Sequence, residues 1–199
     1  MMTTAQYKIA ASSTAGAVIQ RYGTLTDRPI SLDHHVRVES VGALNQILAD
    51  TMTLRDLYKK HHWQVSGPMF YQLHLLFDKH FAGQAELVDT LAERIQTLGG
   101  VALAMAGDVA ETSRIARPPR CRENVGVQLF RLSQAHQFII GETREAARAI
   151  AARGDDGTND ILVSGVLRVN EFQAWWISEH LAGTGAIDGF EDVPPCARS

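Results

Sequence analysis

The sequence predicts an all-α protein built as a four-helix bundle with one long crossover. Glycine and proline breakers divide the 199 residues into four long segments, and apolar side chains recur in each segment at the spacing of an amphipathic helix. No segment keeps the strict alternation that is typical of a strand. With 45% hydrophobic and 21% charged residues, the chain can bury one core and suits a single domain.

The breakers also set the expected domain boundaries. They are Ser66-Gly67-Pro68, Gly99-Gly100, residues 117–120, residues 154–157 and the stretch from Gly183 onward. We therefore expect a flexible N-terminal tail over residues 1–35, the bundle over residues 36–182 and a C-terminal tail over residues 183–199.

The first two helices are expected over residues 36–65 and 69–98. The apolar side chains of the first are Val41, Leu44, Leu48, Leu54 and Tyr58. Those of the second are Leu73, Phe77, Phe81, Val88, Leu91 and Ile95. Both sets recur at near-helical spacing, so each helix offers one face to a core.

The last two helices are expected over residues 124–153 and from Thr158 onward, because Thr158 is a good N-cap. The apolar side chains of the third are Val127, Phe130, Leu132, Ile139 and Ile140. Those of the fourth are Ile161, Leu162, Val166, Leu167, Phe172, Trp176 and Leu181. The connection over residues 99–123 must cross the bundle, and residues 107–113 suit a short helix. A bundle with one long crossover is of the ferritin-like kind.

Composition limits the classes of function. The formal net charge of −3 argues against a chain that binds nucleic acid by its overall charge. Cys121 and Cys196 have no zinc spacing, which fits a reducing cytoplasm. No apolar run approaches the roughly 18 residues of a membrane span. Residues 1–20 lack the compact apolar stretch of a signal peptide.

The second helix has a stripe of metal-competent side chains. At about 100° per residue, His74, Asp78, Asp89 and Glu93 fall within one narrow arc. The small residues Ala82, Ala85 and Ala92 share the arc and leave room beside it. The stripe borders the apolar face, where carboxylates are unfavourable unless they are paired or bind a metal. The alternative interpretation is a solvated face with scattered acids and histidines.

Spacing limits the geometry of such a metal site. His74 and Asp78 lie one turn apart, and so do Asp89 and Glu93, but Asp78 and Asp89 are separated by roughly 16 Å along the helix. One chain cannot place both pairs on one ion, whereas an antiparallel twofold dimer would form two identical shared sites. His62, at the end of the first helix, adds a second imidazole. Such a mixed nitrogen and oxygen set suits iron, and zinc remains chemically possible.

Two motifs resemble the signature of the Dps family of mini-ferritins. They read His62-Trp63-x-x-x-Gly67-x-x-Phe70-x-x-x-His74-x-x-x-Asp78 and Asp89-x-x-Ala92-Glu93-Arg94-x-x-x-Leu98-Gly99-Gly100. Weaker similarity extends the resemblance over residues 36–181. It implies a dodecameric shell with ferroxidase centres at twofold interfaces, where His62, His74 and Asp78 come from one chain and Asp89 and Glu93 from its partner. It also implies that iron(II) is oxidised there, with hydrogen peroxide preferred to oxygen, and that ferric mineral is stored inside.

The resemblance suggests roles for further residues. Trp63 matches the family's aromatic residue near the centre, where it could donate electrons, or it is simply a core aromatic. Asp155 and Asp160 match the acidic region of a pore through which iron enters, although Ser164 replaces a further acid of some members. A carboxylate in the first turn of a helix is also stabilised by the helix dipole, which offers Asp160 a structural role.

Two expectations concern the N-terminal region. Asp33, His34 and His35 could bind an additional metal ion, as in some relatives, or form a helix cap with exposed histidines. Many members bind DNA through a lysine-rich tail. Here the three basic residues of the N-terminal tail (Lys8, Arg21 and Arg28) are largely balanced by Asp27 and Asp33, and the C-terminal tail is acidic. We therefore expect weak or absent DNA binding and a cytoplasmic protein, with a nucleoid-condensing shell as the alternative function.

Overall fold

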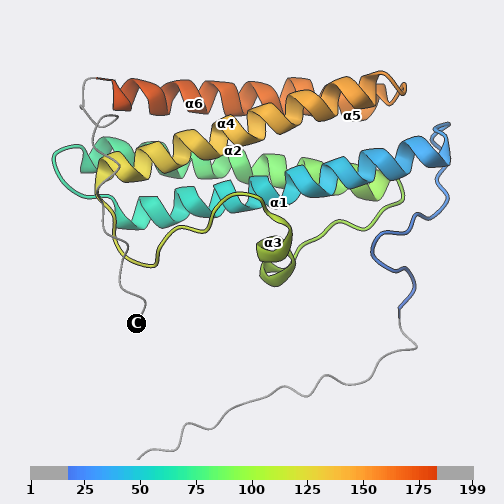
Figure 1. Cartoon of the computed structure of the whole chain (residues 1–199), viewed down its shortest axis with the longest axis horizontal. Helices are drawn as coiled ribbons and strands as arrows, with labels where there is room; N and C mark the ends of the chain where they lie inside the picture. Colours follow the sequence, from blue (N-terminus) through green and yellow to red (C-terminus); the bar gives the residue numbers. More distant parts are fainter. Residues whose placement is uncertain (1–17, 183–199) are drawn as a thin grey trace, which may run out of the picture.

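The computed structural model describes residues 18–182 and confirms the all-α bundle (Figure 1). Its elements are α1 (His34–Gln64), α2 (Phe70–Thr97), α3 (Ala106–Thr112), α4 (Val125–Ala151), α5 (Asp156–Asp160), the π-helix η1 (Ile161–Leu167) and α6 (Arg168–Leu181). The fourth long helix of the bundle is thus built from α5, η1 and α6. No helix in the described part of the chain is long and apolar enough to cross a membrane.

The helices form two antiparallel pairs joined by the crossover. In Figure 1, α1 and α2 run in opposite directions, the crossover returns along the length of the bundle, and α4 is followed by the antiparallel helix of α5, η1 and α6. α1 packs against α2 and α4, and α4 packs against α6. Each large apolar side chain that this core removes from water contributes about 2 kcal/mol to stability. Leu44, Tyr58, Phe77, Leu91 and Leu132 are among those fully buried.

The crossover contains the expected short helix, α3. A buried carboxylate on α1 holds the residues that directly follow the C-terminal end of this helix. The Asp50 carboxylate on α1 accepts hydrogen bonds from Ser113 Oγ at 2.8 Å and from the Arg114 amide at 2.7 Å. Glu142 on α4 lies beside Asp50. Burial and the neighbouring Asp50 raise the pKa of Glu142 to about 7.

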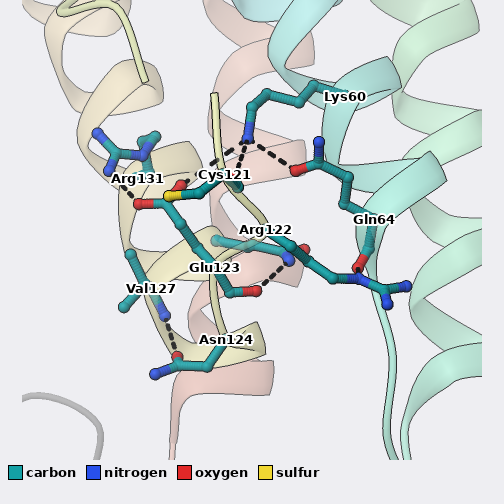
Figure 2. A network of polar contacts seen from close by, with 9 residues as sticks. Lys60, Gln64, Cys121, Arg122, Glu123, Asn124, Val127 and Arg131 are labelled. Atoms are coloured by element: carbon teal, nitrogen blue, oxygen red, sulfur yellow. Dashed lines mark hydrogen bonds and ion pairs between the residues drawn. The ribbon is translucent and has the colours of Figure 1, made fainter. Parts of the chain in front are cut away.

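A second polar network attaches the end of the crossover to α1 and α4 (Figure 2). Lys60 Nζ donates to Gln64 Oε1 at 2.8 Å and to the Cys121 carbonyl at 3.4 Å. Glu123 accepts a hydrogen bond from Arg131 at 2.5 Å and lies 4.0 Å from the Lys60 ammonium. Asn124 caps α4 by accepting a hydrogen bond from the Val127 amide, so the helix begins one residue after its predicted start.

The end of the segment that we expected to be a flexible tail, residues 18–35, makes hydrogen bonds to the bundle. The Thr26 amide donates to the Gly99 carbonyl at 2.9 Å, and Arg37 Nη1 donates to the Thr26 carbonyl at 3.0 Å. Gly99 has a φ of +87°, and a Cβ there would lie 2.3 Å from the Thr26 oxygen, so this contact requires glycine. Residues 1–17 and 183–199, where the rest of both expected tails falls, lie outside the described residues.

The π-helix changes which side chains of the fourth helix face the core. The buried positions are Leu162, Val166, Asn170, Gln173, Ile177 and Leu181. Phe172 and Trp176, which we expected on the apolar face, are instead 48% and 36% exposed. The reason is that a π-helix turn holds more residues than an α-helix turn, so the residues after η1 are rotated relative to an uninterrupted α-helix. Two polar side chains, Asn170 and Gln173, therefore enter the core.

Candidate metal centre

The fold brings His62 and His74 into direct contact at the turn between α1 and α2. Their rings stack with centroids 3.7 Å apart. His62 Nδ1 lies 2.8 Å from the His74 carbonyl oxygen, and His74 Nδ1 lies 3.0 Å from the His62 carbonyl oxygen. Because a carbonyl oxygen only accepts hydrogen bonds, both Nδ1 atoms must be protonated. In a neutral imidazole with this hydrogen bond, the other ring nitrogen, Nε2, is unprotonated and is available as a metal ligand.

Asp78, the third candidate ligand of this group, lies one turn after His74 on α2. Its carboxylate is 53% exposed and lies 4.0 Å from His62 Nδ1. Lys59 Nζ lies 2.5 Å from Asp78 Oδ1, and this hydrogen bond is the main cause that lowers the pKa of Asp78. Sequence reasoning missed Lys59. Its position on α1, three residues before His62, is the signal that could have indicated it, since residues three apart share a helix face.

Asp89 and Glu93, the other two candidate ligands, lie apart from this group. Both side chains are exposed on α2 and lie further along the helix, Asp89 being roughly 16 Å from Asp78 by helical rise. Among residues 18–182, no three or more histidine, cysteine, aspartate or glutamate side chains gather so that they could hold one ion. A single chain therefore offers two separate and incomplete sets of candidate ligands, one at the turn between α1 and α2 and one further along α2.

A groove of about 520 Å³ is lined by side chains of α1 and α2, and none of the five candidate ligands is among its lining residues. Its lining includes Lys59, Trp63, Phe81 and Ala85. Trp63 is 72% exposed in this chain, so it is not a core aromatic. Its role as an electron donor stays a prediction.

Asp155 has a structural role, in contrast to the expected pore role. Its carboxylate is buried, accepts from the Thr158 amide as the N-cap of α5, and pairs with Arg94 at 2.6 Å. Burial alone would raise the pKa of Asp155, but hydrogen bonds from Thr158 and Ser40 and the charge of Arg94 lower it. Asp155 rather than Thr158 is therefore the N-cap, and a carboxylate engaged in this way is not available to passing ions.

The remaining candidates lie on the surface. Asp160 is exposed and accepts a hydrogen bond from Ser164 at 2.7 Å, so a pore role for Asp160 stays a prediction. Asp33, His34 and His35 are exposed at the start of α1, and His35 lies 3.3 Å from Glu39. A second metal site there also stays a prediction.

Lys59 should weaken metal binding, because its ammonium occupies the Asp78 carboxylate that a metal ion would bind. We expect Lys59→Gln to raise the zinc affinity of the assembled protein about 1.4- to fivefold, the range given by the roughly 0.2–1 kcal/mol of an exposed ion pair. Titration calorimetry with zinc avoids the complication of oxidation. Lys79→Gln is the matched control, because Lys79 lies over the Trp176 ring. Equal affinities of the two variants would refute this role of Lys59.

The bundle, its long crossover and the paired histidines and carboxylates define a ferritin-like protein. The model of the ferritin-like domain family matches residues 41–186, so the chain belongs to that family. Within it, the chain belongs to the Dps family of mini-ferritins.

Three relatives illustrate this membership. The structure of DpsC from Streptomyces coelicolor superposes with a TM-score of 0.82 at 49% identity and covers 90% of this chain and 99% of that chain. The DNA protection during starvation protein of Halobacterium salinarum is 31% identical over 133 residues, which is 67% of this chain and 73% of that protein. A nutrient stress-induced DNA-binding protein of a Nostoc species is 31% identical over 178 residues, or 87% and 94% of the two chains.

Proposed function

We propose that this protein is a ferroxidase and iron store, in which iron(II) is oxidised at centres shared between two subunits of a dodecameric shell. The observation that carries the proposal is the pair His62 and His74, whose Nδ1 atoms are both engaged by carbonyl oxygens. Their free Nε2 atoms and the Asp78 carboxylate form a set of nitrogen and oxygen ligands that suits iron. Asp89 and Glu93 of a second subunit would supply the missing carboxylates.

The chain's residues would bind the substrate iron and hold it beside the oxidant. Hydrogen bonds to carbonyl oxygens fix the orientation of the two imidazoles, and the same hydrogen bonds raise their basicity as ligands. Carboxylates can bridge two ions and tolerate both iron charge states. Two iron(II) ions supply the two electrons that reduce one hydrogen peroxide, with two protons, to two water molecules. This stoichiometry releases no hydroxyl radical, and the ferric product would be stored inside the shell.

A nucleoid-condensing shell is the second candidate function. The Nostoc relative is described as a DNA-binding protein, and this supports the candidate. The net charge of −3 per chain argues against this candidate function. Affinity for DNA at physiological salt depends on how many phosphates the basic side chains of the protein neutralise. We therefore propose a cytoplasmic iron-oxidising protein with weak DNA binding.

Complementation between variants tests the sharing of the site. His62→Ala/His74→Ala lacks one half of the ligands, and Asp89→Ala/Glu93→Ala lacks the other. Each variant alone should oxidise iron(II) no faster than buffer with peroxide. After the two are unfolded and refolded together in equal amounts, half of the dimers are mixed and each regains one of two sites. We expect about a quarter of the wild-type rate.

The control is a differential affinity tag on one variant, which verifies that mixed shells form. Mixed shells without recovered oxidation would contradict a shared centre. A wild-type protein that oxidises iron(II) no faster than buffer, but retains tightly bound zinc, would instead favour a metal-binding shell without ferroxidase activity.

A further inference from the structure

The bundle core contains a continuous chain of polar side chains that the candidate metal centre does not use. Tyr58 on α1, His80 on α2, His136 on α4 and Asn170 on α6 are at most 2% exposed. The Tyr58 hydroxyl lies 2.5 Å from His136 Nε2 and 3.0 Å from His80 Nδ1, and His136 Nδ1 lies 2.9 Å from Asn170 Oδ1. Burying so many polar groups is unfavourable unless each is hydrogen-bonded, which gives this chain a defined geometry.

The direction of each hydrogen bond follows from one backbone carbonyl. Asn170 Nδ2 must donate to the Val166 carbonyl at 2.8 Å, so Asn170 Oδ1 faces His136 and accepts from its Nδ1. His136 Nε2 is therefore unprotonated and accepts the Tyr58 hydroxyl hydrogen. Since Tyr58 has only one such hydrogen, His80 Nδ1 must donate to the Tyr58 oxygen.

This arrangement favours the loss of an electron and a proton together from Tyr58. Burial raises the pKa of the Tyr58 phenol well above its usual value, so the phenol does not ionise alone. An acceptor for its proton, His136 Nε2, is already in hydrogen-bond contact. Burial lowers the pKa of His136 to about 4, so the imidazolium would return the proton when the phenoxyl radical is reduced.

We propose that Tyr58 is an internal one-electron donor that supplies the second electron to hydrogen peroxide when a centre holds only one iron(II). The inference rests on the proposed ferroxidase function. Tyr58 precedes the ligand His62 by four residues, or about 6 Å of helical rise. Its ring also packs against Phe77, with centroids 6.0 Å apart, and Phe77 directly precedes Asp78.

The step balances as follows. One iron(II) and Tyr58 each lose one electron, hydrogen peroxide gains both, and two protons from solvent complete two water molecules. The O–H bond of Tyr58 breaks, and its proton forms an N–H bond at His136 Nε2. A later iron(II) returns one electron to the phenoxyl radical, the proton moves back from His136, and the resting pair is restored. A centre with one iron thus avoids the one-electron cleavage of peroxide that forms hydroxyl radical.

Burial distinguishes Tyr58 from the other described aromatic residues that could be oxidised. In the single chain, the other described tyrosines and tryptophans (Tyr22, Tyr71, Trp63, Trp175 and Trp176) are 61%, 70%, 72%, 54% and 36% exposed. Tyr58 is fully buried and would keep its radical long enough for a second iron(II) to arrive.

Freeze-quench electron paramagnetic resonance tests the proposal. The assembled protein is loaded with one iron(II) per centre and mixed with one equivalent of hydrogen peroxide. We expect a tyrosyl radical in the wild type and in Tyr71→Phe, and its loss in Tyr58→Phe. His136→Gln, which keeps the phenol but removes the proton acceptor, should also lose it. Size-exclusion chromatography and circular dichroism verify that each variant is folded and assembled.

A second measurement separates this inference from the proposed function. With two iron(II) per centre, Tyr58→Phe should oxidise iron at the wild-type rate, because the iron supplies both electrons. An undiminished tyrosyl radical in Tyr58→Phe, or oxidation by the wild type without any tyrosyl radical, would overturn the role of Tyr58 and leave the ferroxidase intact. Absence of iron oxidation in the wild type would overturn the proposed function and this inference with it.

Discussion

Glu93→Ala slows peroxide-driven iron(II) oxidation at least about 100-fold while the shell remains assembled. This result is expected because Glu93 is a proposed direct ligand, and removal of groups that merely support a metal ligand already costs 10- to 100-fold in many metal sites. Glu93 is exposed on α2, so its loss leaves the bundle core intact. Absorbance of the ferric product, followed after mixing with peroxide, gives the rate.

Asp89→Ala should have the same effect, because Asp89 and Glu93 lie one turn apart and can contact one ion. Glu145→Ala is the matched control, since Glu145 is an exposed carboxylate on α4, in the other half of the bundle. An unchanged rate in both Asp89→Ala and Glu93→Ala would remove these residues from the centre. A similar loss in Glu145→Ala would indicate a general effect of surface charge instead.

Acid should destabilise the fold strongly, because three histidines are buried in the neutral state. Burial lowers the pKa of His61 and His80 to about 3 and that of His136 to about 4. In the unfolded chain the same groups bind protons near pH 6.5. The unfolded state therefore binds more protons between pH 6.5 and pH 4, so their contribution to stability is complete above pH 6.5 and is lost as the pH falls.

His136 alone accounts for about 3 kcal/mol of this loss by pH 4, at 1.36 kcal/mol per unit of pKa difference. Glu142 opposes it, because its raised pKa of about 7 makes stability fall as the pH rises from about 4.5 to 7. Urea unfolding at pH 7.5 and pH 4.5 measures the net change in the free energy of unfolding. We expect a lower value at pH 4.5.

Two variants assign this change to the buried histidines. His136→Gln should have a smaller difference in unfolding free energy between the two pH values, whatever its stability at pH 7.5. His34→Gln should keep the wild-type difference, because His34 is exposed at the start of α1. If all three proteins lose the same free energy on acidification, the acid sensitivity does not come from His136.

The sequence could predict the long helices and one half of the candidate centre because both depend on local periodicity. Leu73, Phe77, Leu91 and Ile95 recur at helical spacing and are all buried. His62, His74 and Asp78 come together because a short turn joins the end of α1 to the start of α2. The rise of an α-helix per residue also predicts that Asp89 and Glu93 lie too far along α2 to reach the same ion.

Features that depend on distant contacts could not be predicted in this way. The acidic residues around Asp155 suggested a pore. Its carboxylate instead accepts hydrogen bonds from Arg94, 61 residues away, and from Ser40, 115 residues away. The attachment of the segment before α1 depends on a close approach of Thr26 to Gly99. Lys59 beside Asp78 depends on the crossing of two helices.

The π-helix η1 has a consequence for comparing this chain with other sequences. A helix that contains a π segment holds one residue more than an α-helix of equal length, so a relative without the segment should align with a single gap in residues 161–167. A gap inside a helix is usually moved to the nearest loop, here residues 152–155. That shift would align every residue of α5 and much of η1 with the wrong residue of the relative. Alignments of this family are therefore best anchored on both sides of Gly165.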